Sequence, residues 1–128
     1  TCDGFFFRDQ DIAVVGGGDS ALEEALFLTK FARSVTIVHQ LDTFQAEPTS
    51  AHEALANPKI KVLWSHEARA FLGERTLERI RVEDLTARRQ FELPTDGVFI
   101  FVGSSGMLQP GEWQIRKATV NNHAYTFQ

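Results

Sequence analysis

Strand-like and helical patterns alternate along the first forty residues of the chain. Residues 11–15 and 34–39 are short runs rich in β-branched side chains, a composition typical of parallel strands buried in a sheet. Between them, from Leu22 to Ala32, apolar side chains recur three and four positions apart, as in a helix that packs on a sheet. The pattern therefore predicts a strand-helix-strand unit.

The remaining pattern predicts one more helix and further strands. A short helix is expected over 51–56, with its start in 47–50 and its end at Asn57-Pro58, because the residue before a proline is disfavoured in helices. Five segments have strand patterns: 59–65, 67–72, 77–85, 88–93 and 97–103. Residues 73–75 and 86–87 are expected as turns between three antiparallel strands. Weaker strand patterns at 111–115 and 117–120 precede an expected turn at Asn121-Asn122.

These elements predict an α/β fold. We expect a three-layer, Rossmann-like nucleotide-binding domain with a small parallel sheet, two helices and an antiparallel three-strand crossover. In such folds the ligand lies at the carboxyl ends of the parallel strands. This rule predicts a crevice over residues 16–21, 39–45 and Gly103.

Composition narrows the class of protein. The 128 residues suit one domain, and 43% hydrophobic with 23% charged residues is ordinary for a soluble globule. A net charge of −4 gives no electrostatic footprint for nucleic acid. No apolar run approaches a membrane span and no leader is visible, so a cytoplasmic protein is expected. The single cysteine excludes an internal disulfide framework.

Histidines and mixed charges outside the predicted crevice have ordinary structural interpretations. His52 and His66 lack a second ligand at a metal-binding spacing, so no metal site is predicted and both are expected at the solvated surface. Arginines and glutamates mix along the predicted antiparallel strands at positions 78, 79, 81, 83, 88, 89 and 92. Such mixing predicts a solvated sheet face with paired charges.

A glycine-rich turn follows the first predicted strand. Gly16-Gly17-Gly18-Asp19-Ser20-Ala21 satisfies the G-x-G-x-x-A pattern of dinucleotide-binding turns. Gly16 suits a tight turn, Gly18 permits close approach of a pyrophosphate, and Ala21 permits close packing of helix and strand. The N–H groups near Asp19 and Ser20 would offer a positive site for phosphate. The alternative is a purely structural glycine turn.

Five segments together resemble a known family: Thr1-Cys2-Asp3-Gly4-Phe5-Phe6, 14–26, 38–39 with 42–44 and 46, 57–64 and 93–103. They resemble the NAD(P)H-binding domain of bacterial low-molecular-weight thioredoxin reductases, the class II pyridine nucleotide-disulfide oxidoreductases. The resemblance implies that residues 1–128 are one NAD(P)H-binding domain, a fragment of a larger FAD-containing reductase. Residues 1–8 would be the remnant of a redox C-x-x-C-D-G motif, and residues 104–128 are a divergent tail.

The resemblance implies roles for Cys2 and Asp3. Cys2 would be the cysteine of the redox pair closest to the flavin, and Asp3 the acid that exchanges a proton with the dithiol. FAD would be bound by a domain absent from this chain. The full-length protein would be a homodimer that reduces a thioredoxin-like protein. The isolated chain is expected to be inactive, because a lone thiol cannot close an intramolecular disulfide.

The resemblance also directs attention to residues 39–46. The family's NADPH users have H-R-R-D-x-F-R-A there, whose arginines grip the 2′-phosphate, whereas this chain has Gln40, Leu41 and Gln45 at those positions. His39 is kept, as are the aspartate, phenylalanine and alanine of the pattern. Each missing arginine removes roughly 1.5–3 kcal/mol of charge-assisted hydrogen bonding. Glutamines can instead bond ribose hydroxyls, and Leu41 can pack on adenine.

Several interpretations of the cofactor remain open. NADH preference or relaxed specificity is the first, with the segment at Gly103 passing over the nicotinamide, as the resemblance implies. The rivals are a non-catalytic Rossmann module and a reductase domain that uses another electron donor. A flavin-binding glycine motif upstream in the parent reading frame, with a cysteine two residues before Thr1, would favour the reductase.

Overall fold

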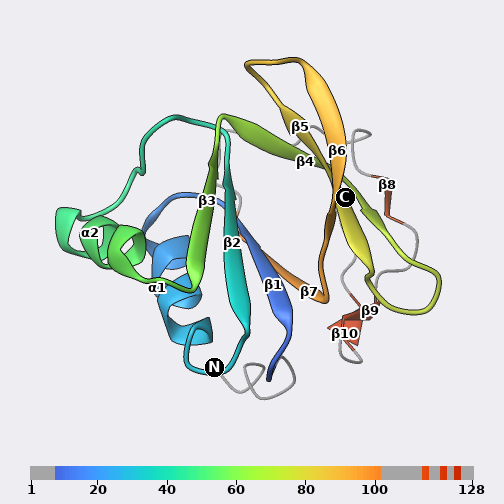
Figure 1. Ribbon diagram of the computed structural model, residues 1–128, viewed down its shortest axis with the longest axis horizontal. Coiled ribbons are helices and arrows are strands. Elements are labelled where there is room, and N and C mark those ends of the chain that lie inside the picture. Colours follow the sequence, from blue (N-terminus) through green and yellow to red (C-terminus); the bar gives the residue numbers. More distant parts are fainter. Residues whose placement is uncertain (1–7, 102–113, 116–118, 121–122, 125–128) are drawn as a thin grey trace.

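Two four-stranded sheets, one two-stranded sheet and two helices make up the described part of the chain (Figure 1). The computed structural model describes residues 8–101, 114–115, 119–120 and 123–124. The elements are β1 (Asp11–Val15), α1 (Asp19–Leu28), β2 (Ser34–His39), α2 (Pro48–Ala56), β3 (Ile60–Trp64), β4 (His66–Leu72), β5 (Arg79–Asp84), β6 (Arg89–Pro94), β7 (Gly97–Ile100), β8 (Gln114–Ile115), β9 (Thr119–Val120) and β10 (His123–Ala124).

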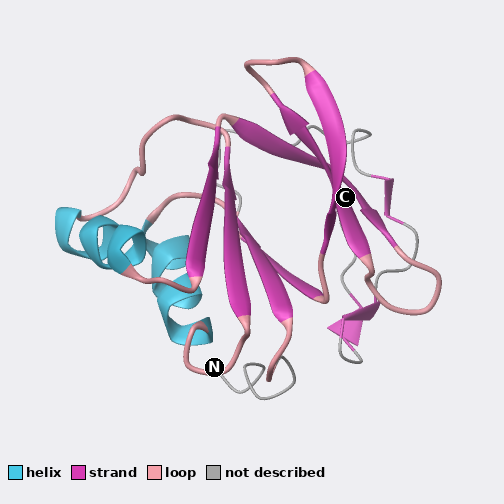
Figure 2. Ribbon diagram, in the orientation of Figure 1, coloured by secondary structure: helices cyan, strands magenta, loops and turns pink. Residues whose placement is uncertain are grey.

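The first sheet is parallel and has the strand order β3-β2-β1-β7. Its central strand β1 is buried over 12–15, and the apolar side chains of β2 and β7 complete the core with Leu22, Ala25 and Leu28 of α1. Burial on both faces explains why these strands are apolar runs rather than alternating ones. Figure 2 shows both helices on one side of this sheet and the second sheet on the other. The predicted three-layer α/β fold is confirmed.

The second sheet contains the three predicted antiparallel strands, β4, β5 and β6. The two-residue strand β8 adds a fourth position, parallel to β4, giving the order β6-β5-β4-β8. The equally short β9 and β10 pair with each other. Strand patterns at 111–115 and 117–120 thus contain β8 and β9, whereas β10 was not expected and the turn at Asn121-Asn122 lies outside the described residues.

Two element boundaries differ from the prediction. The helix α1 ends at Leu28, not at Ala32. The N–H groups of Lys30 and Phe31 donate to carbonyls three residues back, at 3.1 and 3.0 Å, instead of continuing the α-helical pattern. This tight turn sends the chain into β2. The last core strand ends at Ile100 instead of residue 103, and residues 102 and 103 lie outside the described part.

A single residue, Ser65, joins β3 to β4 and so joins the two sheets. Its φ of 59° is left-handed, a conformation that non-glycine residues rarely adopt. Its N–H donates to the Leu41 carbonyl at 3.0 Å, and its carbonyl accepts from Leu85 N–H at 2.8 Å. The loop after β2 is therefore tied by its backbone to the junction of the sheets.

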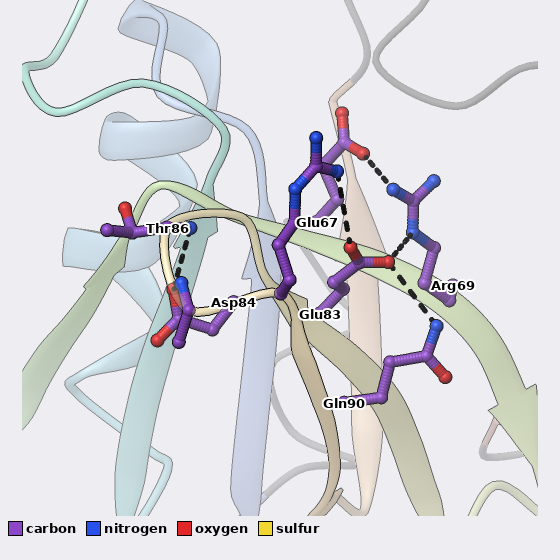
Figure 3. A network of polar contacts seen from close by, with 8 residues as sticks. Glu67, Arg69, Glu83, Asp84, Thr86 and Gln90 are labelled. Atoms are coloured by element: carbon purple, nitrogen blue, oxygen red, sulfur yellow. Dashed lines mark hydrogen bonds and ion pairs between the residues drawn. The ribbon is translucent and has the colours of Figure 1, made fainter.

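Charged residues of the second sheet are paired, but some are sheltered from solvent, which corrects the prediction of a solvated face. Arg69 contacts Glu67 at 2.8 Å and Glu83 at 3.0 Å, and these side chains are only 21%, 14% and 15% exposed. Figure 3 shows Arg69 and Gln90 directed toward Glu83. The β-bulge between Ala68 and Ala70 leaves Arg69 outside the cross-strand register, an irregularity that the alternating pattern does not reveal.

His66 also corrects the prediction. Its side chain is only 14% exposed. Its Nδ1 lies 2.6 Å from the Trp64 carbonyl oxygen, and its ring packs edge-on against Phe91 of β6 at 5.8 Å. His52, by contrast, is exposed on α2 as expected.

Candidate functional site

The glycine turn lies where β1 ends and α1 begins, at the carboxyl edge of the parallel sheet. Gly16 has a φ of +136°, and a Cβ there would lie 2.5 Å from the Phe101 carbonyl oxygen. Its N–H donates to the Val38 carbonyl at 3.0 Å. The same Cβ position lies 3.3 Å from the Cβ of buried Ala21. Both Gly16 and Ala21 therefore have steric reasons to be small within the fold.

The next two glycines differ sharply in their surroundings. A Cβ on Gly17 would lie 2.3–2.5 Å from three atoms of the His39 ring, so Gly17 is required by that ring. A Cβ on Gly18 would meet only the Gln45 carbonyl oxygen, at an ordinary contact distance of 3.7 Å. Gly18 also has an extended φ of −90°. Among the described residues, neither space nor backbone conformation requires glycine at position 18.

The N-terminus of α1 offers backbone donors beside Gly18. The first intrahelical bond runs from Leu22 N–H to the Gly18 carbonyl at 3.1 Å, so the N–H groups of Asp19, Ser20 and Ala21 precede it. Gly18 is the N-cap and supplies no side-chain cap. The Asp19 carboxylate accepts from Glu47 N–H at 2.7 Å. The donors point toward the edge where a ligand of this fold class binds.

The loop after β2 lies along the glycine turn. Gln45 N–H donates to the Gly17 carbonyl at 2.8 Å, and Gln45 forms an isolated parallel bridge with Gly18. Gln40 is half-buried, whereas Leu41, at 38% exposure, and Gln45 present their side chains to solvent. Residues 39–47 contain no lysine or arginine. This edge of the site therefore combines a polar amide, an apolar side chain and no local positive charge.

The buried side chain of His39 contacts the inner side of this loop. Its side chain is 3% exposed, and its Nε2 lies 2.8 Å from the Thr43 carbonyl oxygen. The rings of Phe44 and Trp64 lie 6.0 and 6.2 Å from it, centroid to centroid. Its Nδ1 is buried and has no hydrogen-bond partner within the described part of the chain. Burial lowers the pKa of His39 below the ordinary 6.5, although the Thr43 hydrogen bond opposes the shift.

The structure brings most of the sequence-predicted site residues together. Residues 16–21 form the turn and helix start, and Gln40, Leu41 and Gln45 lie on the adjoining loop. His39 lies beneath the turn rather than at its open side. Cys2, Asp3 and Gly103 lie outside the described residues, as does most of the tail after residue 103.

Sequence reasoning missed the residues that hold the loop in place. Thr43 anchors the His39 ring, and Trp64 lies opposite His39 in the parallel register of β2 and β3. Placing the two predicted strands side by side would have paired these positions. Glu47 was also missed, since its role is a backbone N–H bonded to Asp19.

The described residues contain neither the ligand cluster of a metal site nor a membrane-spanning helix. Within residues 8–101 and the three short strands that follow, no group of three metal-ligating side chains comes together. The helices in that part of the chain are too short to cross a membrane.

The sequence profile of a family described as "Pyridine nucleotide-disulphide oxidoreductase" matches residues 1–115. The chain is 48% identical over 103 residues to the thioredoxin reductase of Streptomyces coelicolor, an alignment that covers 80% of this chain and 32% of that protein. It is 45% identical over 102 residues to a 34.2 kDa protein in the rubredoxin operon of Clostridium pasteurianum, covering 80% of this chain and 33% of that protein.

A solved structure shares the fold. Lactococcus lactis thioredoxin reductase superposes with a TM-score of 0.78 at 39% identity, over 80% of this chain and 34% of that one. The chain thus spans about a third of the length of the curated relatives it matches.

Proposed function

The chain belongs to the pyridine nucleotide-disulphide oxidoreductase family, and from that premise we propose that it is the NAD(P)H-binding domain of a thioredoxin-reductase-like flavoprotein. The whole length, 1–128, would form this one domain, inserted in a larger protein. Its function would be to bind the reduced dinucleotide and present the nicotinamide to FAD. The relatives support an oxidoreductase of this type.

The main observation behind the proposal is the environment of Gly18. The fold gives a reason for glycine at positions 16 and 17, whereas at position 18 the described residues leave room for a Cβ at an ordinary contact distance. A ligand that approaches the backbone closely supplies the missing reason, and a pyrophosphate at a helix N-terminus is such a ligand. The donors of Asp19, Ser20 and Ala21 lie next to it. We assign the pyrophosphate to this turn.

The loop at 40–45 would hold the adenosine. Gln40 and Gln45 carry amides that can bond the ribose hydroxyls, and the exposed Leu41 offers an apolar surface for adenine. The absence of lysine and arginine from residues 39–47 leaves a 2′-phosphate without a local cation. We therefore propose NADH preference or relaxed specificity.

The chemistry of the full-length protein would involve more than this chain. A second domain would hold FAD, and hydride from the nicotinamide would reduce it. Cys2 would belong to the disulfide that takes the electrons onward, with Asp3 exchanging its proton. A thioredoxin-like protein would be the final acceptor, and the full-length protein would be a cytoplasmic homodimer.

Calorimetric titration of the chain with NADH and with NADPH tests the nucleotide site. We expect NADH to bind at least as tightly as NADPH, because the favourable contact of a 2′-phosphate with cationic side chains is missing. NADPH binding should also change little between low and moderate salt. NADPH binding that is tenfold tighter than NADH binding would contradict the proposed specificity. Heat from neither nucleotide, also within the full-length protein, would contradict the site itself.

The chain alone is expected to show no thioredoxin reduction. It contains one cysteine, whereas disulfide transfer by this route needs a redox pair and a flavin. The measurement is the oxidation of NADH and, in a parallel assay, of NADPH in the presence of oxidised thioredoxin and insulin, with a complete NADPH-dependent bacterial thioredoxin reductase as the positive control. Turnover by the isolated chain above the uncatalysed rate would disprove this expectation.

A non-catalytic Rossmann module is the second candidate, and the arginine-free loop favours it. A reductase domain that takes electrons from another donor is a variant of it. The parent reading frame separates these candidates from the first. A reading frame without a flavin-binding glycine motif and without a cysteine two positions before Thr1 would leave the module as the function.

A further inference from the structure

We propose that His39 is a positioning residue whose neutral ring, protonated on Nε2 only, holds the 40–45 loop against the glycine turn. Protonation of the ring would release the loop and weaken nucleotide binding. The proposal rests on the nucleotide site proposed above for its effect on affinity. Its structural part, the state of the ring and its hold on the loop, is testable without any ligand.

The hydrogen bond to Thr43 determines which ring nitrogen carries the proton. A carbonyl oxygen can only accept, so the contact of 2.8 Å between Nε2 and the Thr43 oxygen requires a proton on Nε2. In the neutral ring, Nδ1 is then a bare acceptor. It is buried and has no partner among the described residues. An unpaired acceptor is tolerable there, but a second N–H at Nδ1 would be a buried donor without an acceptor.

Described residues pack closely against the ring on several sides. Gly17 lies against one side so closely that a single added Cβ would overlap three ring atoms. Trp64 and Phe44 lie around the ring and contact each other at 4.5 Å between centroids. A protonated ring would therefore have to leave this position to reach water. Leaving it would break the bond to Thr43 and remove the support of the loop.

Among the residues that the structure describes, no charged group compensates a proton on this ring. The glycine turn contributes no titratable side chain that faces it, and β3 contributes Trp64. On the loop, Asp42 and Glu47 are exposed, and neither forms an ion pair with His39 in the described part of the chain. On α1, Asp19 is engaged with the Glu47 backbone. Burial is accordingly the main cause that lowers the pKa of His39.

The direction of the pH effect follows from this lowered pKa. Between the lowered folded value and 6.5, the unfolded or loop-released state binds more protons than the native state. The support from His39 is therefore complete above pH 6.5 and is lost as the pH falls through the folded pKa. One linked proton changes an equilibrium by at most about tenfold per pH unit.

Nitrogen NMR of the ligand-free chain tests the ring directly. The His39 signals are identified by their loss in His39→Gln. We expect chemical shifts of an Nε2–H tautomer and a midpoint below 6.5. We also expect the protection of the Gln45 amide, its exchange rate relative to the intrinsic rate at the same pH, to fall as His39 is protonated. The Gln45 N–H donates the hydrogen bond that joins the loop to the Gly17 carbonyl oxygen. An Nδ1–H tautomer, a midpoint at or above 6.5, or unchanged protection of the Gln45 amide would overturn the proposal.

The pH dependence of NAD⁺ binding tests the predicted effect of His39 on the nucleotide site. NAD⁺ is used because it is stable in acid. His39→Gln places an N–H donor near the former Nε2 and cannot titrate, so it should bind within about threefold of wild type at pH 7.5 and respond little to acid. Wild type and the matched control His52→Gln, at an exposed site, should lose affinity by about threefold or more at pH 5.0. An equal loss in His39→Gln would overturn the proposal.

The two proposals fail in different ways. Absence of NAD⁺ and NADH binding by wild type at pH 7.5 would count against the proposed function, while the tautomer, the midpoint and Gln45 exchange still decide the role of His39. Normal binding with an ordinary His39 titration would count against this inference alone.

Discussion

Alanine at Gly17 is expected to lower the free energy of unfolding by about 2–3 kcal/mol, the range of an overpacked core site. The added methyl group would meet the buried His39 ring at 2.3–2.5 Å. The ring cannot yield easily, because Thr43 and the neighbouring aromatic side chains hold it. Urea unfolding followed by far-ultraviolet circular dichroism measures the loss.

Gly18→Ala is the matched control for this prediction. Its methyl group would meet only the Gln45 carbonyl, at 3.7 Å, so the loss should stay below about 1 kcal/mol, as for an N-cap replacement. The same variant should weaken nucleotide binding about tenfold or more if a pyrophosphate approaches that atom. Equal losses of stability in the two variants would contradict the steric explanation. In a His39→Ala background, Gly17→Ala should cost much less.

Arginines at positions 40, 41 and 45 are expected to raise NADPH affinity by about 10²–10³-fold, with little change for NADH. Each charge-assisted hydrogen bond is worth roughly 1.5–3 kcal/mol, and the three will not add fully. Leu41 and Gln45 are exposed and Gln40 is half-buried, so the longer side chains can reach solvent. The measurement is calorimetric titration with both nucleotides.

A charge-matched variant separates local from general electrostatics. Arginines at the exposed positions Leu55, Ala87 and Gln90 add the same charge outside residues 40–45. They should change NADPH affinity less than about threefold at moderate salt, because salt screens exposed charges that do not contact the phosphate. A similar gain in both variants would mean that net charge, and not a phosphate clamp, governs binding. If neither variant gained NADPH affinity, the 2′-phosphate would not lie near residues 40–45.

The sequence predicted much of the fold because its signals are local. The β-branched runs at 11–15 and 34–39 match β1 and β2 residue for residue, since burial on both faces dictates their composition. The three antiparallel strands were likewise predicted within one or two residues. The glycine turn was recognisable because its spacing depends on the covalent chain alone.

What the sequence did not predict depends on contacts between distant elements. The burial of His39 requires the parallel register that places it opposite Trp64 and the turn that brings Gly17 onto its ring. The sheltering of His66 requires Phe91 from another strand. The bulge at Arg69 likewise arises only when two strands are aligned. None of these residues differs locally from a solvent-exposed residue of its type.

The position of β1 between β2 and β7 determines when β1 can complete its pairing during synthesis on the ribosome. The contact between Asp11 N–H and the Asp96 carboxylate spans 85 residues, and β7 follows it directly. The antiparallel hairpins can pair as soon as they emerge, since their partners are neighbours in the chain. The central strand keeps an open apolar edge until Gly97–Ile100 has been synthesised. The most buried strand of the domain is thus made before most of the domain, yet it lacks one of its two partner strands until residue 100 has been added.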